Sequence, residues 1–309
     1  MNDRKIIIIL GPTAVGKTDL SIEVAEEIGA EIISADSRYL YRGMNIGTAK
    51  PDKHQLERVP HHLIDVASIE ENWSLAQFKE AALESIEKTF RKGKLPILVG
   101  GTGQYIRSII EGWDIPKKAP DEKMRSALIG WAERIGEKSL HEKLMMIDPV
   151  AAEKIDYRNL RRTIRALEVI LHTGRKFSSQ RDKKPLSFQY KMIGLVRPRK
   201  ELYERIDQRI DQMMASGFIG EVESLLKKGY SLGNPPMSAI GYKEIIQYLK
   251  NDLTYEECIN DIRRRTRQFV RRQANWFKET DERIRWFDAS TVNKGETISF
   301  IMDKSGWIK

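Results

Sequence analysis

Residues 6–18 read Ile-Ile-Ile-Ile-Leu-Gly-Pro-Thr-Ala-Val-Gly-Lys-Thr, an apolar run followed directly by a glycine loop. The loop, Gly11–Thr18, has the spacing G-x-x-x-x-G-K-[ST] of a phosphate-binding loop, which joins a buried strand to a helix. Both flanks are present, because a strand is expected at residues 5–10 and an apolar stripe predicts a helix from Lys17 to Gly29. The stretch therefore predicts a parallel α/β core and a ligand that carries phosphate.

Each residue type in this loop has a physical task. Gly11 and Gly16 allow backbone torsions that other residues resist, so that successive N–H groups can turn inward around an anion. Lys17 supplies positive charge to the terminal phosphates, and the Thr18 hydroxyl is the expected ligand of Mg²⁺. The residues predicted to bind phosphate are Gly11, Pro12, Thr13, Ala14, Val15, Gly16, Lys17 and Thr18. The alternative, a chance glycine turn, is disfavoured by the strand and helix on either side.

The composition favours a globular protein of one large or two modest domains. The chain has 309 residues, of which 40% are apolar, and no run approaches the ~20 apolar residues of a membrane span. The single cysteine, Cys258, excludes an internal disulfide and a cysteine-based zinc site. Because Met1 leads quickly into a strand rather than a signal peptide, we expect a cytoplasmic protein. The net charge of +9 suits a polyanionic partner without identifying one.

Strands and helices alternate along the chain. Further buried strands are expected at residues 31–35, 95–99 and 191–196. A helix is expected at 74–92, where Ser74 and Gln77 have the spacing of a capping box. This alternation predicts a P-loop NTPase-like parallel sheet with right-handed crossovers.

The stretch 114–188 differs from its surroundings because it is charged, helical and poor in strand patterns. Helices are expected there at residues 121–135, 139–146 and 159–172. Since this stretch falls between two core strands, we interpret it as an inserted helical subdomain. The predicted organisation is therefore a first part of the core at 1–113, the insertion at 114–188, and a region at 189–309 that completes the core and ends in helices. The last long helix is expected to begin at Thr254, with Glu257 completing a second capping box.

Two polar or glycine-rich segments follow strands of the predicted sheet. Asp36 follows the strand at 31–35, and Gly100–Gly103 (GGTG) follows the strand at 95–99. In an open α/β sheet the ligand crevice lies beyond the carboxyl ends of the strands, so these segments should meet the phosphate loop there. NTPases that hydrolyse their nucleotide normally end such a strand in a metal-supporting Asp, which is missing after 95–99. For Asp36 the alternative is a turn or N-cap residue.

Eight segments of the chain match one known family in order. They are GPTAVGKT (11–18), ISADSRYLYRGMNIGTAK (33–50), PHHLIDV (60–66), LVGGTGQYI (98–106), RRTIRALEV (161–169), LYERIDQRIDQMMASG (202–217), AIGYKE (239–244) and TRQFVRRQANWFK (266–278). The chain thus resembles the tRNA isopentenyltransferase family, the bacterial tRNA dimethylallyltransferases. The resemblance implies transfer of a dimethylallyl group from dimethylallyl diphosphate to the N6 amine of the adenosine beside the anticodon (position 37), with release of diphosphate.

The same resemblance implies roles for individual residues. Asp36 matches the family's general base, and Thr102 matches the residue that orients the reacting amine. Lys17, with Mg²⁺ on Thr18, is expected to stabilise the departing diphosphate. Arg209 matches an arginine that helps to neutralise this charge, although Arg205, one turn earlier, is an open alternative. The chain departs from the family at position 39, where Tyr39 replaces a common Gln.

The expected tRNA contacts fall in three groups. An adenine stacked in a loop must be extruded before it can react, so a base pocket and a surface for the RNA backbone are both expected. The residues expected in the base pocket are Asp36, Ser37, Arg38, Tyr39 and Thr102. The insertion is expected to contribute Arg125, Arg161, Arg162 and Arg165. The last helix is expected to contribute Arg263, Arg267 and Arg271. Residues 263, 267 and 271 repeat every four positions and form what we call the arginine stripe. A solvated arginine face is the alternative interpretation.

The expected partners are the tRNA anticodon stem-loop, dimethylallyl diphosphate and Mg²⁺, with no membrane and with a monomeric protein. The phosphate loop is also typical of ATP-binding proteins, so a small-molecule or nucleoside kinase is one alternative. An adenylate isopentenyltransferase that uses the same loop is a second, and a non-catalytic RNA-binding protein is a third. The first two leave the insertion and the arginine-rich helix unexplained, and the third leaves Asp36 and the intact loop unexplained.

Overall fold

The computed structural model describes residues 4–115, 121–181, 187–303 and 305–308. The chain forms two compact units. The first comprises Met1–Ile110 and Leu186–Lys309, and the second comprises Glu111–Pro185. The second unit is therefore continuous in sequence, whereas the first is assembled from both sides of it.

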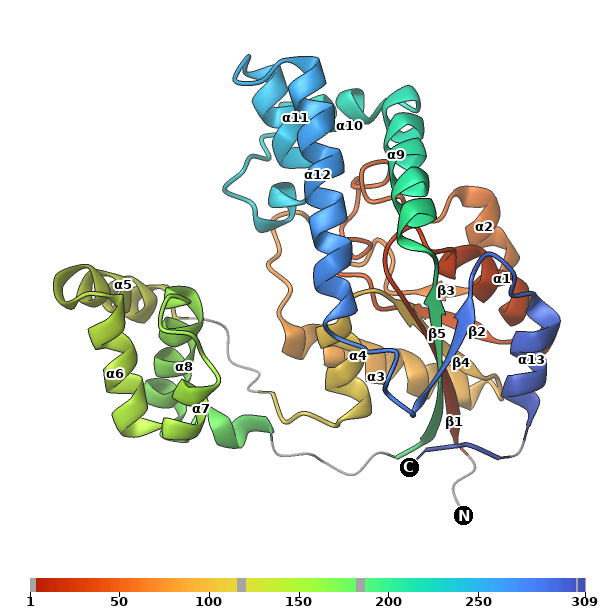
Figure 1. Ribbon diagram of the computed structural model, residues 1–309, viewed down its shortest axis with the longest axis horizontal. Helices are drawn as coiled ribbons and strands as arrows, with labels where there is room; N and C mark the ends of the chain where they lie inside the picture. Colours follow the sequence, from red (N-terminus) through yellow and green to blue (C-terminus); the bar gives the residue numbers. More distant parts are fainter. Residues whose placement is uncertain (1–3, 116–120, 182–186, 304, 309) are drawn as a thin grey trace. The chain divides into compact units, whose positions relative to one another are not determined.

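The first unit is built on a six-stranded parallel sheet with the order β3-β2-β4-β1-β5-β6 (Figure 1). Its strands are β1 Lys5–Leu10, β2 Glu31–Ser34, β3 His61–His62, β4 Pro96–Gly100, β5 Gln189–Val196 and β6 Ile284–Asp288. The central strand β1 is a continuous apolar run because both of its faces are covered. Leu10 at its end pairs with Gly100 on β4 and with Gly194 on β5. This register starts the phosphate loop and the GGTG loop next to each other.

The described helices of the first unit are α1 Lys17–Ile28, α2 Lys53–Arg58, α3 Leu75–Arg91, α4 Gly103–Ile110, α9 Arg199–Ala215, α10 Phe218–Lys227, α11 Tyr242–Leu249, α12 Tyr255–Ala274 and α13 Lys294–Met302, with a 3-10 turn at Pro235–Ser238. Helix α1 packs with α13 and contacts β4, while α3 packs with α4 and contacts β2. Figure 1 shows α9 and α12 side by side beyond the carboxyl ends of the strands. These two helices therefore stand over the edge of the sheet where a ligand is expected.

The second unit contains α5 Glu122–Ile135, α6 Glu137–Ile147, α7 Pro149–Glu153, α8 Leu160–Thr173 and a 3-10 turn at Ser178–Arg181. No strand occurs among its described residues. It has its own core, in which Leu140, Leu144 and Ala166 are fully buried. The three helices expected in this stretch are present, each within two residues of its expected ends.

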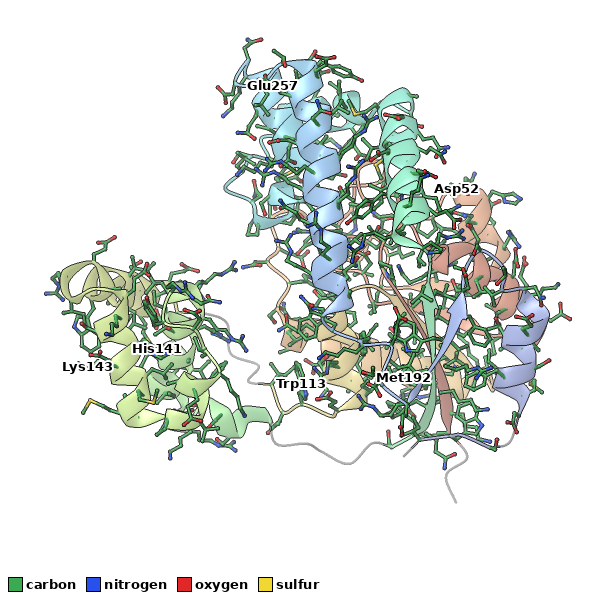
Figure 2. All side chains as sticks on the ribbon, in the orientation of Figure 1. Asp52, Trp113, His141, Lys143, Met192 and Glu257 are labelled. Carbon is green, nitrogen blue, oxygen red and sulfur yellow. The ribbon has the colours of Figure 1, made fainter. Side chains whose placement is uncertain are left out.

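The predicted α/β class with a parallel sheet is confirmed, and so are the four predicted strands. Both capping boxes are present: the Ser74 hydroxyl accepts from the Gln77 N–H, and Thr254 accepts from Glu257, at the end of α12 farthest from the sheet (Figure 2). The two edge strands β3 and β6 were not predicted. They are covered less completely than β5, whose Met192 is fully buried in the core (Figure 2), so their sequences lack a continuous apolar run.

Candidate active site

The phosphate loop turns sharply between β1 and α1. Gly11 has φ 153° and Gly16 has φ 112°, both in the region that favours glycine. A Cβ on Gly11 would also lie 2.7 Å from the carbonyl oxygen of Leu195. Gly16 is the N-cap of α1 and has no side chain, so the first N–H groups of the helix are left to a ligand. The loop thus has the form of an anion cradle.

Lys17 is the cation at the centre of this cradle. Its Nζ donates to the carbonyl oxygen of Pro12 at 2.7 Å. Burial lowers the pKa of Lys17 to about 8, the Asp36 carboxylate opposes this effect, and the Arg209 guanidinium adds to it. A dianionic or trianionic ligand at this point would raise the pKa of Lys17 again, because opposite charge favours the ammonium.

A cavity of about 450 Å³ opens over the loop. Its lining brings together residues far apart in the sequence: Thr13, Ala14, Gly16, Lys17, Thr18, Asp36, Tyr39, Arg205, Arg209 and Gln273. We call it the phosphate cavity. Most of its lining is polar and its base is the cradle, so it suits a small, highly charged ligand.

A second cavity of about 440 Å³ adjoins the first. The two share Thr13, Ala14, Asp36, Thr48 and Arg209 in their linings, whereas Thr102, Ser37 and Arg38 line only the second. We call it the acceptor cavity. The Ser37 N–H lies 3.4 Å from the Thr102 hydroxyl, and Asp36 Oδ1 accepts from the Arg38 N–H at 2.8 Å. Asp36 therefore stands where the two cavities meet, held in place by its own loop.

Both candidate arginines on α9 reach the phosphate loop. Arg205 donates from Nε to the carbonyl oxygen of Ala14 at 3.0 Å. Arg209 lies 3.5 Å from the Thr13 hydroxyl and donates to the carbonyl oxygen of Ala49 at 3.2 Å. Only Arg209 of the two lines both cavities. Arg209 is therefore the arginine of the two that lies at the junction of the cavities.

Tyr39 lies in the phosphate cavity rather than in the acceptor cavity. Its hydroxyl donates to the carbonyl oxygen of Ala49 at 2.7 Å. Burial, reinforced by the Asp36 carboxylate, raises the pKa of Tyr39 to about 12. The hydroxyl therefore stays protonated beside Arg209, in the phosphate cavity and not in the cavity where the base is expected.

The arginine stripe on α12 is not an open surface. Arg263 pairs with Asp211 of α9 at 2.6 Å, and Arg267 pairs with Asp207 and lies over the Tyr203 ring at 5.2 Å. The sequence placed residues 263, 267 and 271 on one face correctly, but it did not show that carboxylates of α9 pair with the first two. Their guanidinium groups are already neutralised by carboxylates of the neighbouring helix, whereas Arg271 is exposed.

Another face of α12 points into the acceptor cavity. Arg265, Phe269 and Arg272 line it, and they are spaced as one helix face. Trp276 continues toward the GGTG loop, where a Cβ on Gly103 would come within 2.2 Å of the indole ring. Sequence reasoning missed these residues as site residues, although the interleaving of aromatic side chains with arginines was a usable signal.

The arginines of the insertion divide into two kinds. Arg125 and Arg165 contact Glu168, at 3.1 Å and 3.2 Å respectively. Burial would raise the pKa of the Glu168 carboxyl, but the hydrogen bonds from these arginines hold that pKa below its usual range. Arg161 and Arg162 are exposed at the start of α8. The first pair therefore helps to hold this unit together, and the second pair is available to a partner.

Among the described residues there is no group of three or more His, Cys, Asp and Glu side chains that could hold a metal ion. None of the helices described is both long and apolar enough to cross a membrane. The site therefore consists of a backbone cradle, a carboxylate at the junction of two cavities, and arginines supplied by α9 and α12.

The chain is similar to known proteins over most of its length. The sequence model described as IPP transferase matches residues 39–280. The tRNA dimethylallyltransferase of Thermomicrobium roseum is 43% identical over 99% of this chain and 93% of its own length. The crystal structure of the full-length tRNA isopentenylpyrophosphate transferase of Bacillus halodurans has a TM-score of 0.70 and 39% identity, and it covers 97% of this chain and 94% of that one.

A third similar structure is that of a eukaryotic enzyme. A eukaryotic dimethylallyltransferase, described in crystallographic snapshots acting on tRNA, has a TM-score of 0.81 and 28% identity, over 96% of this chain and 79% of that one. The family match extends over most of the chain, and the bacterial relative is similar over nearly all of it. The chain therefore belongs to the IPP transferase family, together with these tRNA dimethylallyltransferases.

Proposed function

We propose that the protein transfers a dimethylallyl group from dimethylallyl diphosphate to the N6 amine of the adenosine beside the anticodon of tRNA, at position 37, and releases diphosphate. The single observation that carries this proposal is the place of Asp36, at the junction of the phosphate cavity and the acceptor cavity. A donor bound in the first cavity and a base bound in the second would meet at this carboxylate.

The phosphate loop would bind the leaving group. Its backbone N–H groups and Lys17 would stabilise the negative charge that develops on the diphosphate as the bond from carbon to oxygen breaks. Arg209 supports this role because it lines both cavities and so lies near the position of that bond. The Tyr39 hydroxyl, which also lines the phosphate cavity, would turn from the Ala49 carbonyl oxygen to donate its single hydrogen bond to the diphosphate.

Asp36 would act as the general base. The N6 lone pair of adenine is delocalised into the ring, so the amine becomes acidic only as the new bond to carbon forms. The Asp36 carboxylate would then accept the N6 proton. Thr102 would orient the amine, since its hydroxyl already lies 3.4 Å from the Ser37 N–H in the loop that carries Asp36.

The face of α12 in the acceptor cavity would bind the extruded base and its neighbours. Phe269 offers an aromatic platform, and Arg272 offers a planar cation for bases or phosphates. Arg38 and Ser37 would contact the target base from the opposite loop. Arg271 on α12, together with the exposed Arg161 and Arg162 of the insertion, would bind the RNA backbone by charge.

The donor set of the phosphate cavity fits a Mg²⁺ ion. Mg²⁺ usually binds through one or two protein oxygens together with phosphates of the substrate. The Thr18 hydroxyl lines the cavity and offers such an oxygen, and the diphosphate would supply others. Thr18 would hold the ion, which when bound neutralises charge on the diphosphate. We also propose that the protein acts as a monomer in the cytoplasm, where its tRNA acceptor is found.

One experiment separates this function from its alternatives. Dimethylallyl diphosphate with a labelled prenyl group is offered together with bulk tRNA, with AMP, or with ATP and a mixture of nucleosides. We expect label in tRNA only. Label in AMP would instead identify an adenylate isopentenyltransferase, and consumption of ATP with phosphorylation of a nucleoside would identify a kinase.

A further inference from the structure

One side chain of α12 connects the two loops that form the site. Gln273, in the last turn of the helix, accepts the Thr13 N–H of the phosphate loop at its Oε1 (2.9 Å). Its Nε2 donates to the carbonyl oxygen of Gly101 in the GGTG loop at 3.1 Å. Both ends of the amide are thus used, one on each loop, and the residue that follows Gly101 is Thr102.

The amide of Gln273 lies beyond the end of the sheet, where hydrogen bonds between strands no longer hold the two loops together. The pairing of β1 with β4 ends at Leu10 and Gly100, so Thr13 and Gly101 lie beyond the last ladder positions. Behind the bridge is a largely apolar cavity of about 480 Å³, lined among others by Pro12, Gly101 and Gln273. Beyond the sheet, the amide of Gln273 joins the two loops directly, with one hydrogen bond to each.

Glycine at position 101 makes the close approach possible. A Cβ built there would lie 2.3 Å from Gln273 Nε2. Any larger residue would push the amide away from the Gly101 carbonyl group. The bridge therefore depends on two residues that are far apart in the sequence, one in the GGTG loop and one on α12.

We propose that Gln273 is a positioning residue that sets the distance between the bound diphosphate and the acceptor amine, by clamping the phosphate loop to the GGTG loop. The inference rests on the proposed transfer reaction. The leaving group is held by residues around Thr13, and the acceptor is oriented by Thr102. Because an error of about 1 Å in such an alignment can cost on the order of 10²-fold in rate, the clamp acts on the chemical step more than on the binding of either substrate.

The first test replaces Gln273 by Met, which keeps the length of the side chain and removes both hydrogen bonds. We expect kcat to fall by roughly tenfold or more, while the KM values for tRNA and for dimethylallyl diphosphate change by less than about threefold, because the binding contacts remain. Gln268→Met is the matched control, since Gln268 is an exposed glutamine on the same helix. Thermal unfolding of both variants separates loss of alignment from loss of fold.

The second test uses Gln273→Glu and does not depend on the first. An ionised carboxylate accepts from the Thr13 N–H but cannot donate to the Gly101 carbonyl group, whereas a protonated carboxyl group does both. The ratio of the variant's kcat to the wild-type kcat should therefore rise as the pH falls from about 8 toward about 5. A residue with a merely structural role would give a flat ratio.

The outcomes are distinct. An unchanged kcat in a folded Gln273→Met variant would overturn the clamp. A pH-independent ratio of kcat values in Gln273→Glu would also overturn it. The Glu variant decides the question if the Met variant does not fold. Gly101→Ala, which displaces the amide from the other side, should lower kcat to a similar extent, and the double variant should be no slower than either single one. A wild-type protein and a Gln268→Met variant that transfer nothing to tRNA would instead overturn the proposed function.

Discussion

The phosphate loop and helix α12 carry the two strongest signals in the sequence, and they differ in how much those signals say. In the loop, Gly11 and Gly16 adopt the torsions that their residue type permits, and Lys17 lies at the centre of the cradle. On α12, two of the three stripe arginines pair with Asp207 and Asp211 of α9. The conformation of a motif of consecutive residues can be predicted from those residues alone. The role of a helix face depends also on the helix that packs against it.

The largest effect should come from Asp36, which follows strand β2 and was placed at the ligand edge of the sheet from the sequence pattern. Asp36→Asn keeps an oxygen that can accept the Arg38 N–H but removes the base. We expect prenyl transfer to fall by on the order of 10³-fold, with tRNA affinity retained. Single-turnover rates and tRNA binding measured on the same preparation check this. Transfer at a near wild-type rate would show that another group takes the proton.

The charge of Lys17 should appear in the pH dependence of donor use. With a pKa of about 8 in the free protein, the ammonium is lost as the pH rises above that value. Since the anionic diphosphate binds the charged form, kcat/KM for dimethylallyl diphosphate should fall about tenfold per pH unit above the pKa. Lys17→Met should be weak at every pH and lack this alkaline limb. A wild-type profile that stays level from about pH 7 to 10 would contradict the assignment.

Variants of α12 test most directly whether the helix packed against each face decides the role of its arginines. Arg272→Ala should weaken tRNA binding several-fold and reduce the slope of log affinity against log salt by about 1, because Arg272 faces the acceptor cavity. Arg267→Ala should leave that slope unchanged and lower the free energy of unfolding by about 1 kcal/mol, since its partner is Asp207. Titrations at several salt concentrations, with denaturation curves, decide between these outcomes. If Arg267→Ala alone flattened the slope, the stripe would be an RNA surface after all.

The smallest effect is expected at the position where the chain departs from its family. Tyr39→Phe removes one hydroxyl from the phosphate cavity and leaves the ring in place. Loss of one hydrogen bond should raise the KM for dimethylallyl diphosphate about fivefold and leave the KM for tRNA unchanged. Steady-state kinetics with each substrate varied in turn measure both values. A change confined to the KM for tRNA would place the hydroxyl at the base instead.

The sequence by itself determined the parallel core, the phosphate loop and the place of Asp36 at the ligand edge of the sheet. Buried central strands are continuous apolar runs, capping boxes are local, and the ends of parallel strands share one edge of the sheet, so Asp36 and Thr102 could be assigned to one region. The family resemblance added the reaction. None of this required knowledge of which helices lie over that edge.

Only the tertiary structure decided which side chains of α12 face α9 and which face the acceptor cavity. Packing of the two helices turns Arg263 and Arg267 toward carboxylates of α9 and turns Phe269 and Arg272 toward the acceptor cavity. It also brings Gln273 to two loops that it follows by 260 and 172 positions in the chain. A sequence pattern gives the angular spacing of residues on one helix, but the partner of each face depends on contacts between distant segments, which no local pattern contains.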